Sequence, residues 1–173
     1  MDTPSASENN ATRGGGGTLA IIPCSKEKIW DVHPQAGPTP AGAVYISPFH
    51  EVTRRYAEQF ADRWVILSAL HGFLEAEDLV PEAYDVTFDR PEDPVIGQGA
   101  LMKQVEDKHL MRADRVIVVC GDSYTTRVVA AFEGYAGELV TPLAGLEVPD
   151  EMTVVLQRQL HVEPSSKSDA GKR

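Results

Sequence analysis

The sequence of 173 residues contains few cysteines and no long apolar run. Its two cysteines, Cys24 and Cys120, are far apart and form no CxxC pair, which argues against a disulfide framework and against a zinc ribbon. No stretch approaches the roughly 18 apolar residues that a membrane helix needs, and residues 1–10 lack the basic and apolar regions of a signal peptide. We therefore expect a soluble, cytoplasmic protein with reduced thiols and no membrane partner.

Basic residues are also scarce, since 16 lysines and arginines face 26 acidic residues and the formal net charge is −10. A negative mean field repels polyanions, so long nucleic acids are not expected to bind nonspecifically. That argument does not extend to a small nucleoside, nucleotide or anion, or to a single flipped base, because local charge decides such contacts. Lys26, Lys28, Arg54 and Arg55 can supply a local positive patch.

Both ends of the chain are small, polar and rich in glycine or serine. Residues 1–17 and 163–173 cannot bury enough apolar surface to offset the entropy of ordering, so both predict disordered arms. Residues 18–162 remain as a single folded domain, which a 42% apolar composition is sufficient to support.

Short apolar runs alternate with helical patterns through this domain. Ser47 is the predicted N-cap of the clearest helix, with Pro48 at its first position, while Asp122 or Ser123 and Asp150 are the predicted caps of two later helices. Such alternation predicts a mostly parallel sheet with helices on both faces, an α/β fold with three layers. Strands are expected at 18–23, 63–69, 114–120 and 137–143, helices at 47–61, 98–112, 121–134 and 149–160, and long connections at 31–43 and 70–97.

Polar segments follow three of these strands: PCSKEK, SALHGF and CGDSY. The carboxyl ends of parallel strands meet at one edge of a sheet, where ligands bind, so the three segments are expected to share one cleft. The acidic segment 75–93 is a possible lid over it. The residues expected in this cleft are Cys24, Ser25, Lys26, Lys28, Ser68, His71, Gly72, Cys120, Gly121, Asp122, Ser123 and Tyr124.

Cys24 and His71 are the first candidate catalytic residues. Lys26 or Lys28 can lower the pKa of the Cys24 thiol and make it a nucleophile, although a cysteine at a strand end is equally typical of core packing. His71 can act as an acid or base near neutral pH, or simply form a hydrogen bond in a loop. Gly72 allows a sharp turn or a close approach to a ligand.

Tyr84 and Asp85 form a second candidate pair, a stacking ring beside a carboxylate that can serve as a general base, or else a loop anchor and a turn. Ser25 either binds a phosphate or base edge or closes a turn. The segment 120–124 opens a helix and can bind an anion, although Asp122 suits a hydroxyl better. No GxGxxG, P-loop or HExxH motif is present, so we predict no cofactor and no metal.

These motifs together carry a family resemblance. The pattern PCSxxK, then LSAxxGxL, a downstream YD at Tyr84 and Asp85, and GxxY from Gly121 to Tyr124 resembles a small prokaryotic and phage family of uncharacterised proteins. The resemblance implies an α/β sandwich that is Rossmann-like or uracil-DNA-glycosylase-like. Pro23, Cys24, Ser25 and a nearby lysine are also similar to the catalytic region of archaeosine synthases, which modify a deazaguanine base in transfer RNA.

The cleft and the resemblance together suggest an enzyme that acts on a nucleobase, nucleoside or nucleotide, in modified-base metabolism and with glycosidase-type or transferase-type chemistry. Two alternatives use the same residues: a noncatalytic module that binds a small ligand, or an accessory protein in phage defence or nucleic-acid processing.

Overall fold

A five-stranded sheet forms the centre of the computed structural model, which describes residues 16–162. Its strand order is β4-β3-β1-β6-β7, and all neighbouring pairs are parallel except β3 with β4 at one edge. The five strands are β1 (Thr18–Pro23), β3 (Arg63–Ser68), β4 (Gly72–Leu74), β6 (Arg115–Val118) and β7 (Glu138–Val140). Apart from Gly16 and Gly17, the predicted terminal arms lie outside the described residues.

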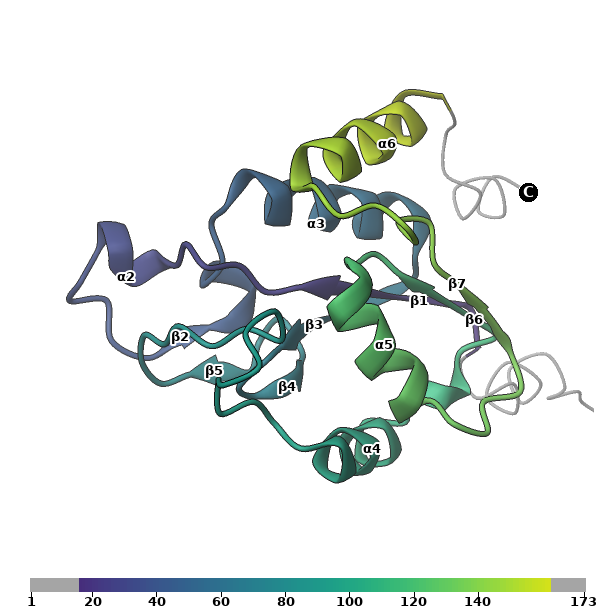
Figure 1. The fold of residues 1–173 in the computed structure, drawn as a ribbon, viewed down its shortest axis with the longest axis horizontal. Helices are drawn as coiled ribbons and strands as arrows, with labels where there is room; N and C mark the ends of the chain where they lie inside the picture. Colours follow the sequence, from purple (N-terminus) through teal and green to yellow (C-terminus); the bar gives the residue numbers. More distant parts are fainter. Residues whose placement is uncertain (1–15, 163–173) are drawn as a thin grey trace, which may run out of the picture.

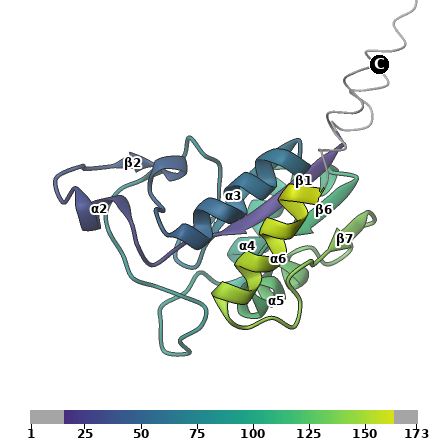
Figure 2. The same cartoon turned by 90° about the horizontal axis from the view of Figure 1, so that it is seen from above.

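Helices cover both faces of this sheet, as Figures 1 and 2 show. The main helices are α3 (Pro48–Phe60), α4 (Gln98–Asp107), α5 (Asp122–Ala131) and α6 (Pro149–Val162). Helices α3 and α6 pack together on one face, and α4 and α5 pack together on the other. The predicted three-layer α/β fold with a mostly parallel sheet is therefore confirmed. Within residues 16–162, no helix combines the length and apolar character that a membrane crossing requires.

The strand β1 lies at the middle of the sheet and is buried on both faces. Ala20 and Ile22 belong to the hydrophobic core under α3 and α6, whereas Leu19 and Ile21 belong to the core under α4 and α5. A strand covered on both sides has no polar face, which explains why its sequence shows a continuous apolar run.

Helix starts follow the predicted pattern at α3 but not elsewhere. The Ser47 side chain accepts a hydrogen bond from the His50 backbone, and Pro48 occupies the first turn, as predicted. Helix α5 instead has Gly121 as its N-cap without a side-chain cap, so the predicted cap at Asp122 or Ser123 is wrong. Helix α6 begins at Pro149, which puts Asp150 inside the first turn rather than at the cap.

Both long connections contain short elements that the sequence pattern did not reveal. The first includes the end of α2 (Ile29–Val32) and holds β2 (Thr39–Pro40) and the 3-10 helix η1 (Ala41–Ala43), and the second holds β4 and β5 (Leu79–Val80). A further 3-10 turn, η2 (Leu110–Arg112), follows α4. Strands β2 and β5 pair with each other, and together with α2 they lie beyond one end of the main sheet (Figure 1).

Candidate functional site

A cavity of about 880 Å³ opens where β1 and β6 end. In the sheet, β3 lies beside β1 on one side and β7 lies beside β6 on the opposite side. The loop that leaves β1 and the loop that leaves β6 therefore run in opposite directions, and they diverge between these two strands. This divergence is the topological switch point at which doubly wound α/β proteins bind ligands. The cavity size is within the usual range for small-molecule sites.

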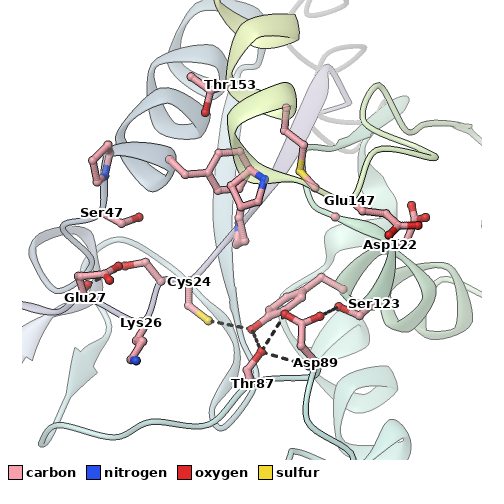
Figure 3. Close-up of a pocket in the computed structure, with 18 of the residues that line it drawn as sticks. Cys24, Lys26, Glu27, Ser47, Thr87, Asp89, Asp122, Ser123, Glu147 and Thr153 are labelled. Atoms are coloured by element: carbon pink, nitrogen blue, oxygen red, sulfur yellow. Dashed lines mark hydrogen bonds between the residues drawn. The ribbon is translucent and has the colours of Figure 1, made fainter.

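Most of the predicted site residues line this cavity, and Figure 3 shows several of them. The segments after β1 and β6 meet here as expected. The predicted residues in its wall are Cys24, Ser25, Lys26, Lys28, Asp85, Gly121, Asp122, Ser123 and Tyr124. The predicted residues outside the wall are Ser68, His71, Gly72, Tyr84 and Cys120.

The segment after β3 does not reach the cavity because it turns straight back into β4, where Gly72 pairs with Ser68. Gln104 holds this turn by accepting from the Phe73 backbone at 2.7 Å and donating to the His71 carbonyl at 3.0 Å. Gly72 has a φ of +81°, and an added Cβ would meet the Gln104 amide. Its glycine is therefore explained by the turn and by the closeness of Gln104 rather than by a ligand.

Cys120 is also outside the cleft, since it is 1% exposed and its thiol points at the Ile21 carbonyl within the core. Burial raises the pKa of this thiol well above its ordinary value.

A cluster of hydroxyl groups supports the cavity wall behind Lys28. The Tyr84 hydroxyl forms hydrogen bonds with the Ser68 hydroxyl at 2.7 Å and with the Tyr45 hydroxyl. The rings of Tyr84 and His71 make a T-shaped contact, with 5.1 Å between ring centres. The Lys28 ammonium lies 4.3 Å from the centre of the Tyr84 ring. Tyr84 therefore contacts Lys28 in the cavity wall, whereas Ser68 and His71 contact Tyr84 and do not line the cavity.

Lys28 is only 3% exposed and donates to the Lys26 carbonyl at 3.1 Å. Burial lowers the pKa of its amine, an effect opposed by Cys24, Asp85 and Asp31. The Ser25 hydroxyl donates to the Glu27 carbonyl at 2.7 Å and so closes a turn, which is the second of the two roles considered for it above.

The Cys24 thiol lies at one end of a hydrogen-bonded chain across the cavity wall (Figure 3). Its sulfur is 3.5 Å from the Tyr124 hydroxyl, which is 3.3 Å from the Thr87 hydroxyl. Thr87 donates to Asp89 at 3.2 Å, and Ser123 donates to the other oxygen of the same carboxylate. Three segments distant in the sequence therefore connect Cys24 to an exposed carboxylate.

The direction of this chain follows from what each group can donate. An ionised carboxylate only accepts, so the Thr87 hydrogen points at Asp89. Thr87 then accepts from the Asp89 backbone at 3.1 Å and from Tyr124, which leaves Tyr124 to accept from the Cys24 thiol. Every hydroxyl hydrogen in the chain thus points towards Asp89.

Burial raises the pKa of the Cys24 thiol above its ordinary value. The Tyr124 hydroxyl, the Ala69 backbone and the Lys28 charge act in the opposite direction but do not outweigh it. The Lys28 charge therefore lowers the thiol pKa as expected, but burial outweighs it and the net shift is upward. Burial also raises the pKa of Tyr124, so its hydroxyl keeps its proton near neutral pH and can pass one on.

The segment 85–90 forms one wall of the cavity. Arg90 fixes it by donating to the Asp85 carbonyl at 2.8 Å and to Asp93 at 2.9 Å. The Phe88 ring packs edge-on against Tyr124, with 4.7 Å between ring centres. These contacts hold Thr87 and Asp89 beside Tyr124.

Two parts of the wall were not predicted from the sequence. Residues 47–49 at the start of α3 contribute, and so does the segment from Leu146 to Thr153 that leads into α6. Thr87, Asp89 and Arg90 were also missed as individual residues. Their position directly after the YD pair and inside the predicted 75–93 lid was the one available signal.

The chain belongs to the family of unknown function DUF6884, whose model matches residues 19–157. It is 41% identical over 140 residues to the uncharacterized protein YfjM of Bacillus subtilis (strain 168), covering 81% of this chain and 93% of that protein. The expected membership of an uncharacterised family is thereby confirmed. The similarity to archaeosine synthases stays a prediction.

A solved structure, the crystal structure of AF0587, a protein of unknown function, superimposes with a TM-score of 0.43 at 15% identity. The match covers 86% of this chain and 46% of that one, so the chain spans about half the length of the solved protein.

Proposed function

We propose that the protein is an enzyme that acts on a nucleobase, nucleoside or nucleotide, with the Cys24 thiol as its nucleophile. The observation that carries this proposal is the chain of hydroxyl groups leading from the Cys24 thiol, on the cavity wall, to the Asp89 carboxylate. A partly buried thiol with a raised pKa needs a route by which its proton can leave, and this chain supplies one.

The lining of the cavity supports a flat heterocyclic ligand. Phe49 and Tyr124 contribute aromatic rings, and Pro23, Val86 and Met152 contribute apolar surface. Carboxylates and hydroxyls at the rim can accept the N–H donors along the edges of nucleobases, as Asp and Glu accept from cytosine N4. Apolar and aromatic surface combined with directed polar groups is typical of sites for small ligands.

The proposed step begins with the Cys24 thiol protonated. As the sulfur forms a bond to an electrophilic carbon of the ligand, its proton passes to Tyr124, the Tyr124 proton to Thr87, and the Thr87 proton to Asp89. The bond from that carbon to the leaving group breaks with its electron pair, and the proton now on Asp89 is available to neutralise the leaving group. Water or a second substrate then releases the covalent intermediate, as in other nucleophilic catalysis.

The test is turnover of a panel of free bases, nucleosides and nucleotides, followed by liquid chromatography with mass spectrometry. Wild-type protein is expected to form a product, and Cys24→Ala to lose activity by about a hundredfold or more. Cys120→Ala removes the other thiol, which lies outside the cavity, and is expected to keep its activity. Full turnover by a folded Cys24→Ala protein would exclude the mechanism.

The same panel separates the proposal from a noncatalytic binding module that uses the same cavity. Such a module binds a ligand tightly and releases no product over long incubation. A cytoplasmic location belongs to the proposal as well, since a reducing compartment keeps Cys24 in the thiol form that the step requires.

A further inference from the structure

The charges around the cavity are unevenly distributed. Its lining includes six carboxylates and three basic side chains, so the wall is net negative. The acidic residues are Glu27, Asp85, Asp89, Asp122, Glu147 and Asp150, and the basic residues are Lys26, Lys28 and Arg90.

Two of the three basic groups are already engaged by the protein. Arg90 pairs with Asp85 at 3.1 Å and with Asp93 at 2.8 Å. Lys28 is buried, with its ammonium on the Tyr84 ring and on a backbone carbonyl. Lys26 is left as the exposed cation of the lining, and it has no ion-pair partner among residues 16–162.

Helix starts at the cavity do not compensate for this shortage of positive charge. Helices α3, α5 and α6 all begin there, and a helix N-terminus carries about half a positive charge. Each of the three also carries an acidic residue in its first turn: Glu51 in α3, Asp122 in α5 and Asp150 in α6. A full negative charge outweighs the partial positive charge of the helix end beside it.

We infer that the cavity selects uncharged or cationic ligands and rejects phosphorylated ones, so that its substrates are free nucleobases or nucleosides rather than nucleotides. The nucleobase part of this inference rests on the proposed function. A phosphomonoester brings about two negative charges into the cavity at neutral pH. Charges that face one cavity are only partly screened at a Debye length of about 10 Å, so repulsion reaches the ligand.

Charge selection can be measured without knowing the substrate, because Cys24 reports on the cavity. Neutral iodoacetamide and anionic iodoacetate alkylate thiols by the same reaction. The ratio of their rates at Cys24 is expected to exceed the ratio for a short cysteine peptide by about tenfold at low salt, and to fall towards the peptide ratio in high salt. A ratio equal to that of the peptide would overturn the inference.

The charged groups responsible can be tested by a matched pair of double variants. Asp122→Asn with Asp150→Asn removes two charges at the cavity, and Glu106→Gln with Glu133→Gln removes two exposed charges that do not line it. The first pair is expected to bring the rate ratio down, whereas the second is expected to leave it unchanged. An equal effect of both pairs would show that the total charge of the protein, and not the cavity, makes the selection.

Binding of nucleosides and their 5′-monophosphates, measured by calorimetry, completes the experiment. Nucleosides are expected to bind at least about tenfold more tightly than the monophosphates. Equal or tighter binding of the monophosphates would overturn the inference while leaving the proposed function intact. If the alkylation ratio is raised but no nucleobase compound binds, charge selection holds and the proposed function fails.

Discussion

The slow reactivity of Cys24 in the free protein is the prediction that most directly tests the site. An ordinary thiol with a pKa near 8.5 is about 3% thiolate at pH 7. Because burial raises the Cys24 pKa, its thiolate fraction at pH 7 is smaller than this. Alkylation by iodoacetamide at pH 7 is therefore expected to be slower than that of a cysteine peptide, and its rate is expected to level off at a higher pH than the rate of the peptide.

Tyr124→Phe perturbs this reaction through one hydrogen bond. Once the Cys24 proton has moved along the chain of hydroxyls, the Tyr124 hydroxyl, 3.5 Å from the sulfur, donates to the thiolate and so lowers the pKa of Cys24. Loss of a bond worth about 1 kcal/mol corresponds to an alkylation rate about fivefold slower at a fixed pH. Thr87→Val leaves the hydroxyl of Tyr124 beside the sulfur, so its effect on the rate is expected to be smaller.

Peptide mass spectrometry after timed alkylation measures the rate at each cysteine separately. Cys120 is 1% exposed and serves as an internal control that stays unmodified while the protein is folded. A Cys24 rate that is already at its maximum at pH 7 would refute the assignment of a raised pKa. An unchanged rate in Tyr124→Phe would refute the hydrogen bond from which the proposed proton route begins.

Two further predictions concern stability, measured by urea unfolding. Gly72→Ala is expected to lower the free energy of unfolding by about 3 kcal/mol, because it strains a left-handed backbone and disturbs two Gln104 hydrogen bonds. Gly99→Ala has nothing near the added Cβ and is expected not to lower it. Equal losses for the two variants would contradict this explanation. His50 is buried, and burial lowers its pKa in the folded protein. The stability that it contributes is therefore fully present above the unfolded pKa of about 6.5. Below that pH the free energy of unfolding falls by up to about 1.4 kcal/mol per pH unit. His50→Asn can still donate to the Pro23 carbonyl, and its stability is expected to change less between pH 7.5 and 5; an unchanged slope would rule out His50 as the source.

The sequence alone determined the layers of this fold, because the signals involved are local. Continuous apolar runs report strands buried on both faces, and helical stripes report the faces that cover them. Their alternation led to the parallel sheet, and the polar segments after β1 and β6 then had to share an edge. Cys24 and Gly121 could therefore be assigned to one cleft without coordinates.

Only the tertiary structure decided which side chains line the cavity and in which direction their pKa values are shifted. The return of the chain into β4 removes His71 from the cleft, and that depends on pairing between Ser68 and Gly72 that no local pattern encodes. Thr87 meets Tyr124 across 37 positions of sequence. The sign of the Cys24 pKa shift depends on how completely the surrounding segments exclude water, which charge spacing along the chain cannot reveal.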